Sequence, residues 1–265
     1  MISVIMGIRA AENRLPEVKR AISSIRAQTE SDFELLICDT DSSAGVQNWL
    51  NEIATKDFRI QIIRNETCRS LTQKLNLCLK QSQGEFIARM DADDYSYPNR
   101  FEKQIKFLKK NPQYCAVGCN VREVSQTYMS VRVLPEEPVI KDFRIKFPFI
   151  HPAMMFRRTA LIGIGGYSEC HWQDGCDDYD LMLRLYANKQ KAANLQEVLL
   201  DYSILNSQLK KRAFHLYLNE SVTRFYRFRE LGLLPKWFCY VLKPLIISLI
   251  PRRALYFIKV RFLNN

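Results

Sequence analysis

The sequence predicts an α/β fold built on a mostly parallel sheet with helices on both faces. Two observations predict it. Apolar, strand-like segments alternate with segments of helical periodicity through the first half of the chain. In addition, two of the predicted strands end in acidic residues, Asp39 and the group that begins at Asp91. The carboxyl ends of parallel strands share one edge of a sheet, and ligands bind at that edge in such folds. We therefore expect Asp39 to lie on the same edge as the Asp91 group.

The predicted elements follow one another in a regular order. The predicted strands are apolar runs, as a sheet buried on both faces requires, and they span residues 3–8, 33–39, 59–65, 85–90 and 115–124. The predicted helices place apolar residues on one face, and they span residues 16–28, 46–54, 71–82, a segment starting near Pro98, and a segment starting near Asp177.

Composition sets the class of protein. The chain has 265 residues, of which 47% are hydrophobic and 25% charged, as is usual for one large domain with or without an appendage. Its N-terminus opens into the apolar run "ISVIMGI" without a basic region, so we expect a first strand and not a signal peptide. The eight cysteines are scattered without CxxC spacing, which argues against a zinc site and favours reduced, buried thiols. These features predict a cytoplasmic protein.

The charge is strongly basic, with a net value of +11 and a pI near 9.3. Much of the positive charge lies in about the last sixty residues, interleaved with large apolar side chains, and it forms no compact nucleic-acid motif. This pattern indicates a membrane surface as the partner and not a nucleic acid.

The stretch "RMDADDYSYPNR", residues 89–100, places three carboxylates where a strand ends and a helix begins. They belong to Asp91, Asp93 and Asp94. A strand-end D-x-D offers hard oxygen ligands to Mg²⁺ or Mn²⁺, which proteins hold with one or two carboxylates plus substrate phosphates. Such a cation neutralises the charge that develops on a leaving phosphate.

A second acidic group, Asp174, Asp177, Asp178 and Asp180, leads into a predicted helix. The helix dipole favours acidic residues in the first turn, but it explains one or two of them and not four. A carboxylate that is not bound to the metal can take a proton from an incoming hydroxyl. The two acidic groups together indicate glycosyl transfer from a nucleotide-sugar.

The chain resembles the family 2 glycosyltransferases, which are inverting enzymes with the GT-A fold. The resemblance runs through "ISVIMGI", "AISSIRAQTESDFELLICD", "GEFIARMDADDYSYPNRFEKQIKFLKKNP", "HPAMMFRRTALIGIGGY" and "DDYDLMLRLYANK". It covers roughly residues 2–202 and implies a catalytic domain over residues 1–205. Residues 206–265 are then a C-terminal helical extension.

The resemblance also implies roles for individual residues. Asp93 would bind Mn²⁺ or Mg²⁺, and Asp91 would contact the donor ribose or the metal shell. Asp39 would lie beside the uracil or ribose, and Arg69 would reach the diphosphate, since a guanidinium matches phosphate geometry. Asp178 would be the catalytic base.

The function implied is transfer of a sugar from a nucleotide-diphosphate donor, expected to be a UDP-sugar, to a glycan hydroxyl with inversion. Many relatives extend glycans carried on a membrane lipid during cell-surface polysaccharide assembly. The expected location is therefore the cytoplasm, at the inner face of the cell membrane.

Several positions depart from the family pattern, and they surround the expected nucleotide pocket: Arg9, Ala10, Thr40, Asp41, Ser70, Ser203 and Leu205. They leave open a second hypothesis, in which the chain is a catalytically inactive GT-A subunit of a glycan-assembly complex. A nucleotidyltransferase is disfavoured because "MGIRAAENR" is a poor glycine-rich phosphate loop. His151 is either an acceptor contact or a core histidine, and Trp172 either stacks on a sugar or packs its loop.

The tail, residues 206–265, has a composition of its own. Its apolar stretch, residues 237–250, is shorter than the ~20 residues that span a bilayer and is interrupted by Lys243-Pro244. Aromatic and aliphatic groups beside cations instead predict a helix that lies in the membrane interface. The alternative is that these residues pack on the catalytic domain or form a dimer contact.

Overall fold

The computed structural model describes residues 1–65, 67–170, 172, 174–204 and 213–250. The strands are β1 (Ile2–Ile8), β2 (Phe33–Asp39), β3 (Ile60–Arg64), β4 (Phe86–Arg89), β5 (Tyr95–Ser96), β6 (Tyr114–Val124), β7 (Met129–Arg132), β8 (Met155–Arg157) and β9 (Lys191–Ser203). The α-helices are α1 (Leu15–Arg26), α2 (Ala44–Lys56), α3 (Leu71–Gln81), α4 (Arg100–Lys110), α5 (Arg158–Gly163), α6 (Asp177–Ala187), α7 (Phe214–Glu230) and α8 (Phe238–Leu249). Short 3₁₀ helices occupy Glu12–Arg14, Ile140–Arg144 and His151–Ala153.

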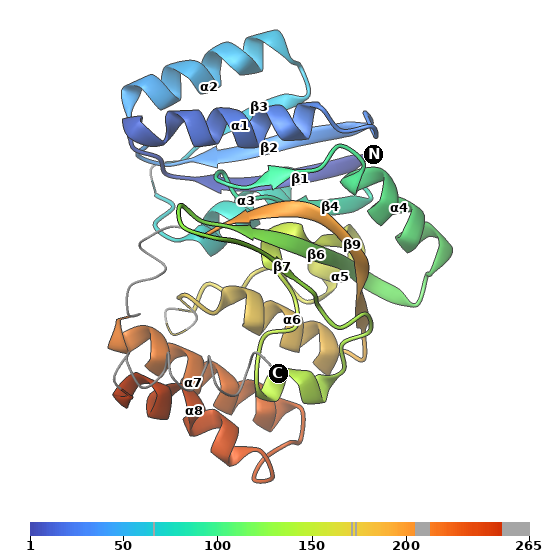
Figure 1. Ribbon diagram of the computed structural model, residues 1–265, viewed down its shortest axis with the longest axis vertical. Helices are drawn as coiled ribbons and strands as arrows, with labels where there is room; N and C mark the ends of the chain where they lie inside the picture. The colour runs from blue at the N-terminus through green and yellow to red at the C-terminus, as the bar shows by residue number, and fades with distance from the viewer. Residues whose placement is uncertain (66, 171, 173, 205–212, 251–265) are drawn as a thin grey trace.

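One nine-stranded sheet organises the molecule (Figure 1). Its order is β3-β2-β1-β4-β8-β6-β9-β5, with β7 paired to β6. Strands β3, β2, β1 and β4 are parallel, as the alternating sequence pattern predicts. The other half is mixed, because β8 runs antiparallel to both β4 and β6. The chain enters β8 from the short 3₁₀ turn His151–Ala153 and not from a crossover helix, which a parallel neighbour would need.

Both faces of the sheet are buried, because successive residues of a strand belong alternately to two hydrophobic clusters. Along β1, Val4 and Met6 belong to one hydrophobic cluster and Ile5 to the other. The first cluster lies under α1, α2 and α4, and the second under α3, α5 and α6. This is the packing that continuous apolar strands predict, and the α/β class expected from the sequence is confirmed.

The C-terminal extension forms two further helices, α7 and α8, stacked beyond α6 (Figure 1). Phe228 of α7 is fully buried, and Trp237 and Val241 are 9% and 5% exposed in the second hydrophobic cluster. An ion pair of 2.6 Å joins Arg227 of α7 to Asp180 of α6. One side of the extension therefore packs against the rest of the protein, while the division of the chain at residue 205 stays a prediction.

Within the described ranges, no helix combines the length and the hydropathy that are needed to cross a bilayer. The tail cations beyond residue 250 and Leu205 lie outside the described residues.

Candidate active site

The ends of β1, β2 and β4 form the edge of the sheet that carries the acidic residues (left in Figure 1). Asp39 is the last residue of β2 and lies in register with Ile8 at the end of β1. Arg89 ends β4, and Asp91 follows it by two residues. The topology therefore places Asp39 and the acidic turn on one edge, separated by the single strand β1.

Three carboxylates converge in the turn after β4. Each of Asp91, Asp93 and Asp94 offers an oxygen that lies within 4.8 Å of the other two. Asp94 is fully buried, and its Oδ1 accepts a 2.8 Å hydrogen bond from the backbone N–H of Ser203. Its Oδ2 is buried and has no hydrogen-bond partner among the described residues. Close carboxylates with an unsatisfied buried oxygen suit a hard divalent cation.

The environment of Asp93 and Asp94 disfavours their charged forms. Burial, and then the charges of Asp91 and Asp93, raise the pKa of Asp94 well above its usual range. Burial and the charge of Asp91 likewise raise the pKa of Asp93. Because a bound cation would reverse this unfavourable charge interaction, the turn has the electrostatics of a metal site.

Two buried arginines hold the acidic turn in place through hydrogen bonds. The guanidinium of Arg89, 1% exposed, donates to Asp91 Oδ1 and to the carbonyl of Met90. Arg100 is fully buried and donates to the carbonyls of Pro152, at 2.9 Å, and Arg89, at 3.1 Å. These bonds tie the end of β4 to the start of α4 and to the 3₁₀ turn before β8.

Two more arginines reach the turn from the first helical segment. Arg14 donates through Nη2 to Asp93 Oδ2 at 3.2 Å. Arg20 of α1 donates to the carbonyl of Asp93 at 2.6 Å and to Ser203 Oγ at 3.1 Å. Ser203, at the end of β9, also donates its hydroxyl to the Asp93 carbonyl. The acidic turn is thus held from both halves of the sheet.

A cavity of about 500 Å³ lies between the acidic turn and the start of α6. Its wall includes Arg89, Asp91, His151, Asp177, Asp178 and Tyr202. The structure therefore brings together the two acidic groups that the sequence singled out.

The two carboxylates at the start of α6 differ in their surroundings. Burial raises the pKa of Asp177 to about 6, against the attraction of Arg89. Asp178 Oδ1 accepts a 2.7 Å hydrogen bond from the backbone N–H of Tyr179, one of the amides left free at a helix start. Both side chains face the same cavity, so either is placed to meet a ligand there.

His151 and Trp172 had two interpretations each. His151 is 6% exposed, and its Nε2 lies 3.0 Å from Tyr167 Oη. Burial, and then the positive charge of Arg89, hold the pKa of His151 well below its usual range, so the ring is neutral at pH 7. It is a hydrogen-bonded histidine that also borders the cavity. The Trp172 ring packs against Tyr226 of α7, with centroids 5.9 Å apart.

The remaining predicted donor residues lie at the same edge in different environments. Asp39 is 2% exposed, ion-paired with Arg64, and its Oδ1 has no hydrogen-bond partner among the described residues. Arg69 is exposed in the loop before α3, two residues before Leu71, which lines the cavity. Lys74 is buried near Asp39, and its Nζ donates to the carbonyl of Ile8 at 2.8 Å.

Three of the departures from the family pattern have structural explanations. Asp41 stands where relatives often have glycine, and its φ of 56° lies in the left-handed region that glycine tolerates best. Aspartate is among the few other residues that adopt this conformation readily. Ser70 caps α3 in a reciprocal capping box with Gln73, and Ser203 holds the acidic turn.

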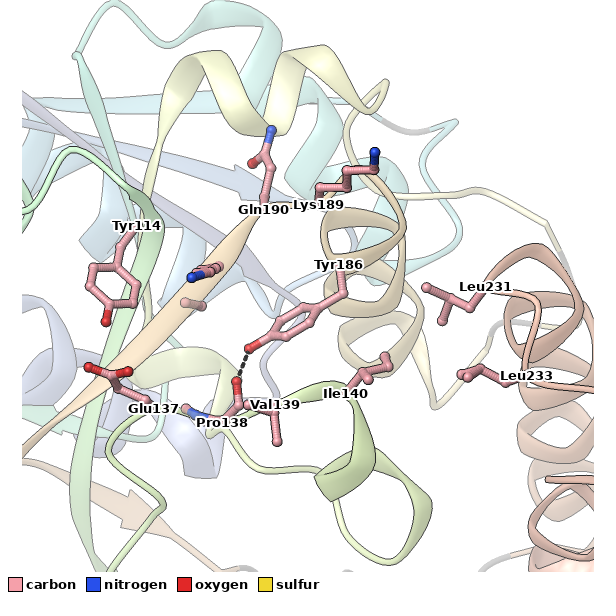
Figure 2. Close-up of a pocket in the computed structure, with 12 residues that line it drawn as sticks. Tyr114, Glu137, Pro138, Val139, Ile140, Tyr186, Lys189, Gln190, Leu231 and Leu233 are labelled. Atoms are coloured by element: carbon pink, nitrogen blue, oxygen red, sulfur yellow. Dashed lines mark hydrogen bonds between the residues drawn. The ribbon is translucent and has the colours of Figure 1, made fainter. Parts of the chain in front are cut away.

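A second cavity, of about 330 Å³, lies away from the acidic residues (Figure 2). Tyr186 of α6 points into it and donates to the carbonyl of Pro138 at 2.6 Å, while Leu231 and Leu233 close it from the turn after α7 (Figure 2). Its lining contains none of the candidate active-site residues.

Comparison with known proteins decides the family. The model of the family described as "Glycosyl transferase family 2" matches residues 5–165, which is more than half of the chain. The chain belongs to glycosyl transferase family 2. A relative in Bacillus subtilis (strain 168), named putative glycosyltransferase EpsE, is 33% identical over 252 residues, covering 94% of this chain and 90% of the relative.

Two further matches extend the family comparison. An Escherichia coli relative named UDP-Gal:alpha-D-GlcNAc-diphosphoundecaprenol beta-1,3-galactosyltransferase is 26% identical over 235 residues, covering 85% of this chain and 82% of the relative. The crystal structure of S. aureus TarS 1-349 in complex with UDP-GlcNAc superposes with a TM-score of 0.71 at 14% identity, covering 91% of this chain and 72% of that one. The GT-A fold expected from the family resemblance is confirmed, and the chain is a glycosyltransferase of family 2.

Some contacts in this family 2 site were not predicted from the sequence. Arg89 carries a signal, because an arginine inside the apolar run "EFIARM" needs a partner when it is buried. Arg14, Arg20 and Tyr202 carry no such signal, since their roles depend on contacts with residues far away in the chain.

Proposed function

We propose that this enzyme transfers a sugar from a UDP-sugar to a hydroxyl of a glycan acceptor, with inversion at the anomeric carbon. The observation that carries the proposal is the cavity in which Asp91 of the acidic turn faces Asp177 and Asp178 of α6. A donor held at the turn would present its anomeric carbon to an acceptor activated at the start of α6.

The acidic turn that carries Asp91, Asp93 and Asp94 is where Mn²⁺ or Mg²⁺ would bind. Asp93 is the proposed metal ligand, and Asp91, fixed by Arg89, would contact the ribose or the metal shell. When bound, the cation neutralises the charge on the departing diphosphate. Asp39 and Arg69 are proposed to contact the nucleoside and the diphosphate, respectively.

The chemical step needs one base and one displacement. Asp178 accepts the proton of the acceptor hydroxyl as its oxygen attacks the anomeric carbon. The bond from that carbon to the diphosphate breaks on the opposite face, and UDP leaves with the bonding electrons. A single displacement inverts the configuration. Asp177 is the first alternative base, because its pKa of about 6 lies closer to neutrality than that of an ordinary carboxyl.

The donor and acceptor classes are supported by the relatives. The E. coli relative is named for UDP-Gal and for an acceptor on diphosphoundecaprenol, and the TarS structure contains UDP-GlcNAc. We therefore propose a UDP-sugar donor and a lipid-linked glycan acceptor in cell-surface polysaccharide assembly. The enzyme would work from the cytoplasm at the inner face of the membrane.

An inactive subunit remains the second candidate, because the nucleotide pocket departs from the family pattern. Two observations favour activity. The acidic turn keeps all three carboxylates, and Asp41 adopts the left-handed backbone conformation that glycine tolerates best.

Incubation of the full chain with a panel of UDP- and other nucleotide-sugars and Mn²⁺ tests the proposal. We expect release of UDP from one sugar class, and no release by Asp93→Ala. Failure to release nucleotide from any donor, with or without a glycan acceptor, would favour the inactive subunit.

A further inference from the structure

The outward face of α8 is apolar along its whole length. Its exposed residues Phe238, Leu242, Ile246 and Leu249 are 48%, 39%, 55% and 78% exposed. Their spacing of four, four and three residues places them on one stripe of the helix. The buried residues of the helix, Val241, Pro244 and Ser248, lie on another side of it.

Helix α7 presents a comparable stripe. Phe214, Leu218 and Phe225 are 60%, 44% and 37% exposed, at spacings of four and seven residues. Because α7 and α8 pack against each other (Figure 1), the two stripes belong to one helical pair. Exposed aromatic and aliphatic side chains of this number are unusual on a soluble monomer and mark an interaction surface.

Side chains beside the two stripes fix both helices to the catalytic core. Phe228 and Val241 are buried, and Arg227 is ion-paired with Asp180 of α6. Lys243 of α8 donates to the carbonyl of Ile145. The apolar face therefore has a fixed orientation relative to the cavity, and it is not a freely hinged appendage.

Exposed cations accompany the two stripes. The acidic residues at Glu220 and Glu230 of α7 are paired with Arg224 and Arg227 of the same helix. The sequence of α8 contains no acidic residue. Arg229 and Lys236, one near each stripe, are exposed. Apolar side chains beside exposed cations are the combination that binds an anionic lipid surface.

We propose that the outward faces of α7 and α8 form the surface on which this protein docks to a bilayer containing anionic phospholipid. The inference deepens the membrane contact of the proposed function and gives it a defined, folded surface. Helix α7 begins and α8 ends on the side of the molecule that carries the acidic edge of the sheet (left in Figure 1). We expect docking there to keep the catalytic cavity close to a lipid-linked acceptor.

Vesicle flotation of the full chain tests this surface, using phosphatidylcholine vesicles with and without phosphatidylglycerol. We expect binding to the anionic vesicles, and binding at least about tenfold weaker for Leu242→Glu/Ile246→Glu, because two charges would have to enter the apolar layer. Phe58→Glu is the matched control, since Phe58 is 92% exposed and lies between α2 and β3; its binding should equal wild type. Arg229→Gln/Lys236→Gln should lower the dependence of binding on salt.

The same variants separate this inference from the catalytic proposal. UDP affinity by calorimetry and the thermal midpoint should stay near wild type in Leu242→Glu/Ile246→Glu. If that double variant misfolds, Leu249→Glu replaces it, because Leu249 is the most exposed residue of the stripe at 78%.

Equal vesicle binding by the wild type and a folded stripe variant would overturn the proposal. A wild type that does not bind vesicles, and instead forms a dimer, would also overturn it if the stripe variants dissociate that dimer. A second copy of the chain would then cover the apolar surface. A wild type that binds vesicles but does not bind UDP would instead contradict the catalytic proposal alone.

Discussion

Arg89 donates from Nη2 to Oδ1 of Asp91, so a fully buried cation at the end of β4 fixes the first carboxylate of the acidic turn. The pair links the hydrophobic interior to the polar cavity within three residues of sequence. It also leaves the second oxygen of Asp91 available to a ligand.

Replacing Arg89 with Gln should therefore weaken both the fold and the site. Removing one partner of a buried pair commonly costs 3–5 kcal/mol, and the partial exposure of Asp91 should bring the loss to about 2–3 kcal/mol. Urea unfolding measures this change, and calorimetry should show weaker UDP binding in the presence of Mn²⁺. The control is Arg122→Gln, whose ion pair with Asp201 is more exposed and should contribute less than about 1 kcal/mol. Equal losses in the two variants would contradict the role assigned to Arg89.

Metal should strengthen nucleotide binding through Asp93. We expect UDP to bind the wild type much more tightly with Mn²⁺ or Mg²⁺ than with a chelator, and Asp93→Ala to abolish that difference. Asp201→Asn, on β9 outside the three-carboxylate group, should keep the metal effect. Calorimetry that gives the same UDP affinity with and without metal for the wild type would remove Asp93 from this role.

Asp178→Asn should separate catalysis from donor binding. The amide keeps the size of the side chain but cannot accept a proton as a carboxylate does, so turnover should fall by about 10²–10⁴. UDP affinity should stay near wild type. Asp177→Asn is the matched variant, and near-normal turnover by Asp178→Asn together with a large loss in Asp177→Asn would move the base to Asp177. The product should show inverted anomeric configuration by NMR.

The pKa of Asp177 predicts a pH dependence of stability. Because its folded value of about 6 exceeds the ordinary value of 3.8, the unfolded chain loses this proton first as the pH rises. The contribution of Asp177 to stability should therefore fall between about pH 4 and pH 6. Since Asp177 is partly exposed at the cavity wall, solvent screening should limit the fall to about 1–2 kcal/mol. Urea unfolding should show that Asp177→Asn lacks this fall and exceeds the wild type in stability at pH 7 in the absence of metal.

The burial of α7 predicts that the extension contributes to the stability of the whole chain. Phe228→Ala should lower the free energy of unfolding by about 3–5 kcal/mol, because it leaves a cavity in a packed core. Phe225→Ala, one turn earlier on the outward stripe, should change it by less than about 0.5 kcal/mol. A second, separate unfolding transition in the wild type would instead indicate that α7 and α8 fold independently.

The parallel half of the sheet was predictable because its strands carry strong local signals. The bounds of β1, β2 and β3 lie within one residue of the apolar runs in the sequence. Strand β8 was not predicted, because its three residues lie inside a longer apolar stretch and have no periodicity of their own. Its antiparallel direction depends on how the preceding turn packs, which spacing alone does not specify.

The residue types of the site were predictable, whereas its supporting contacts were not. Local spacing identified the acidic turn and the start of α6, and the structure places both in one cavity. The contact between Arg14 and Asp93 joins residues 79 apart, and that between Ser203 and Asp94 joins residues 109 apart. Such pairs become neighbours only through the strand order, so no short motif reveals them.

The contact of Ser203 with the acidic turn also bears on the smallest chain that could work. The family model ends at residue 165, before Asp177, Asp178, Tyr202 and Ser203. A fragment ending there would keep the family signature but lose one wall of the cavity and the backbone N–H that donates to Asp94 Oδ1. We therefore expect the minimal catalytic unit to extend at least to the end of β9, well past the segment by which the family is recognised.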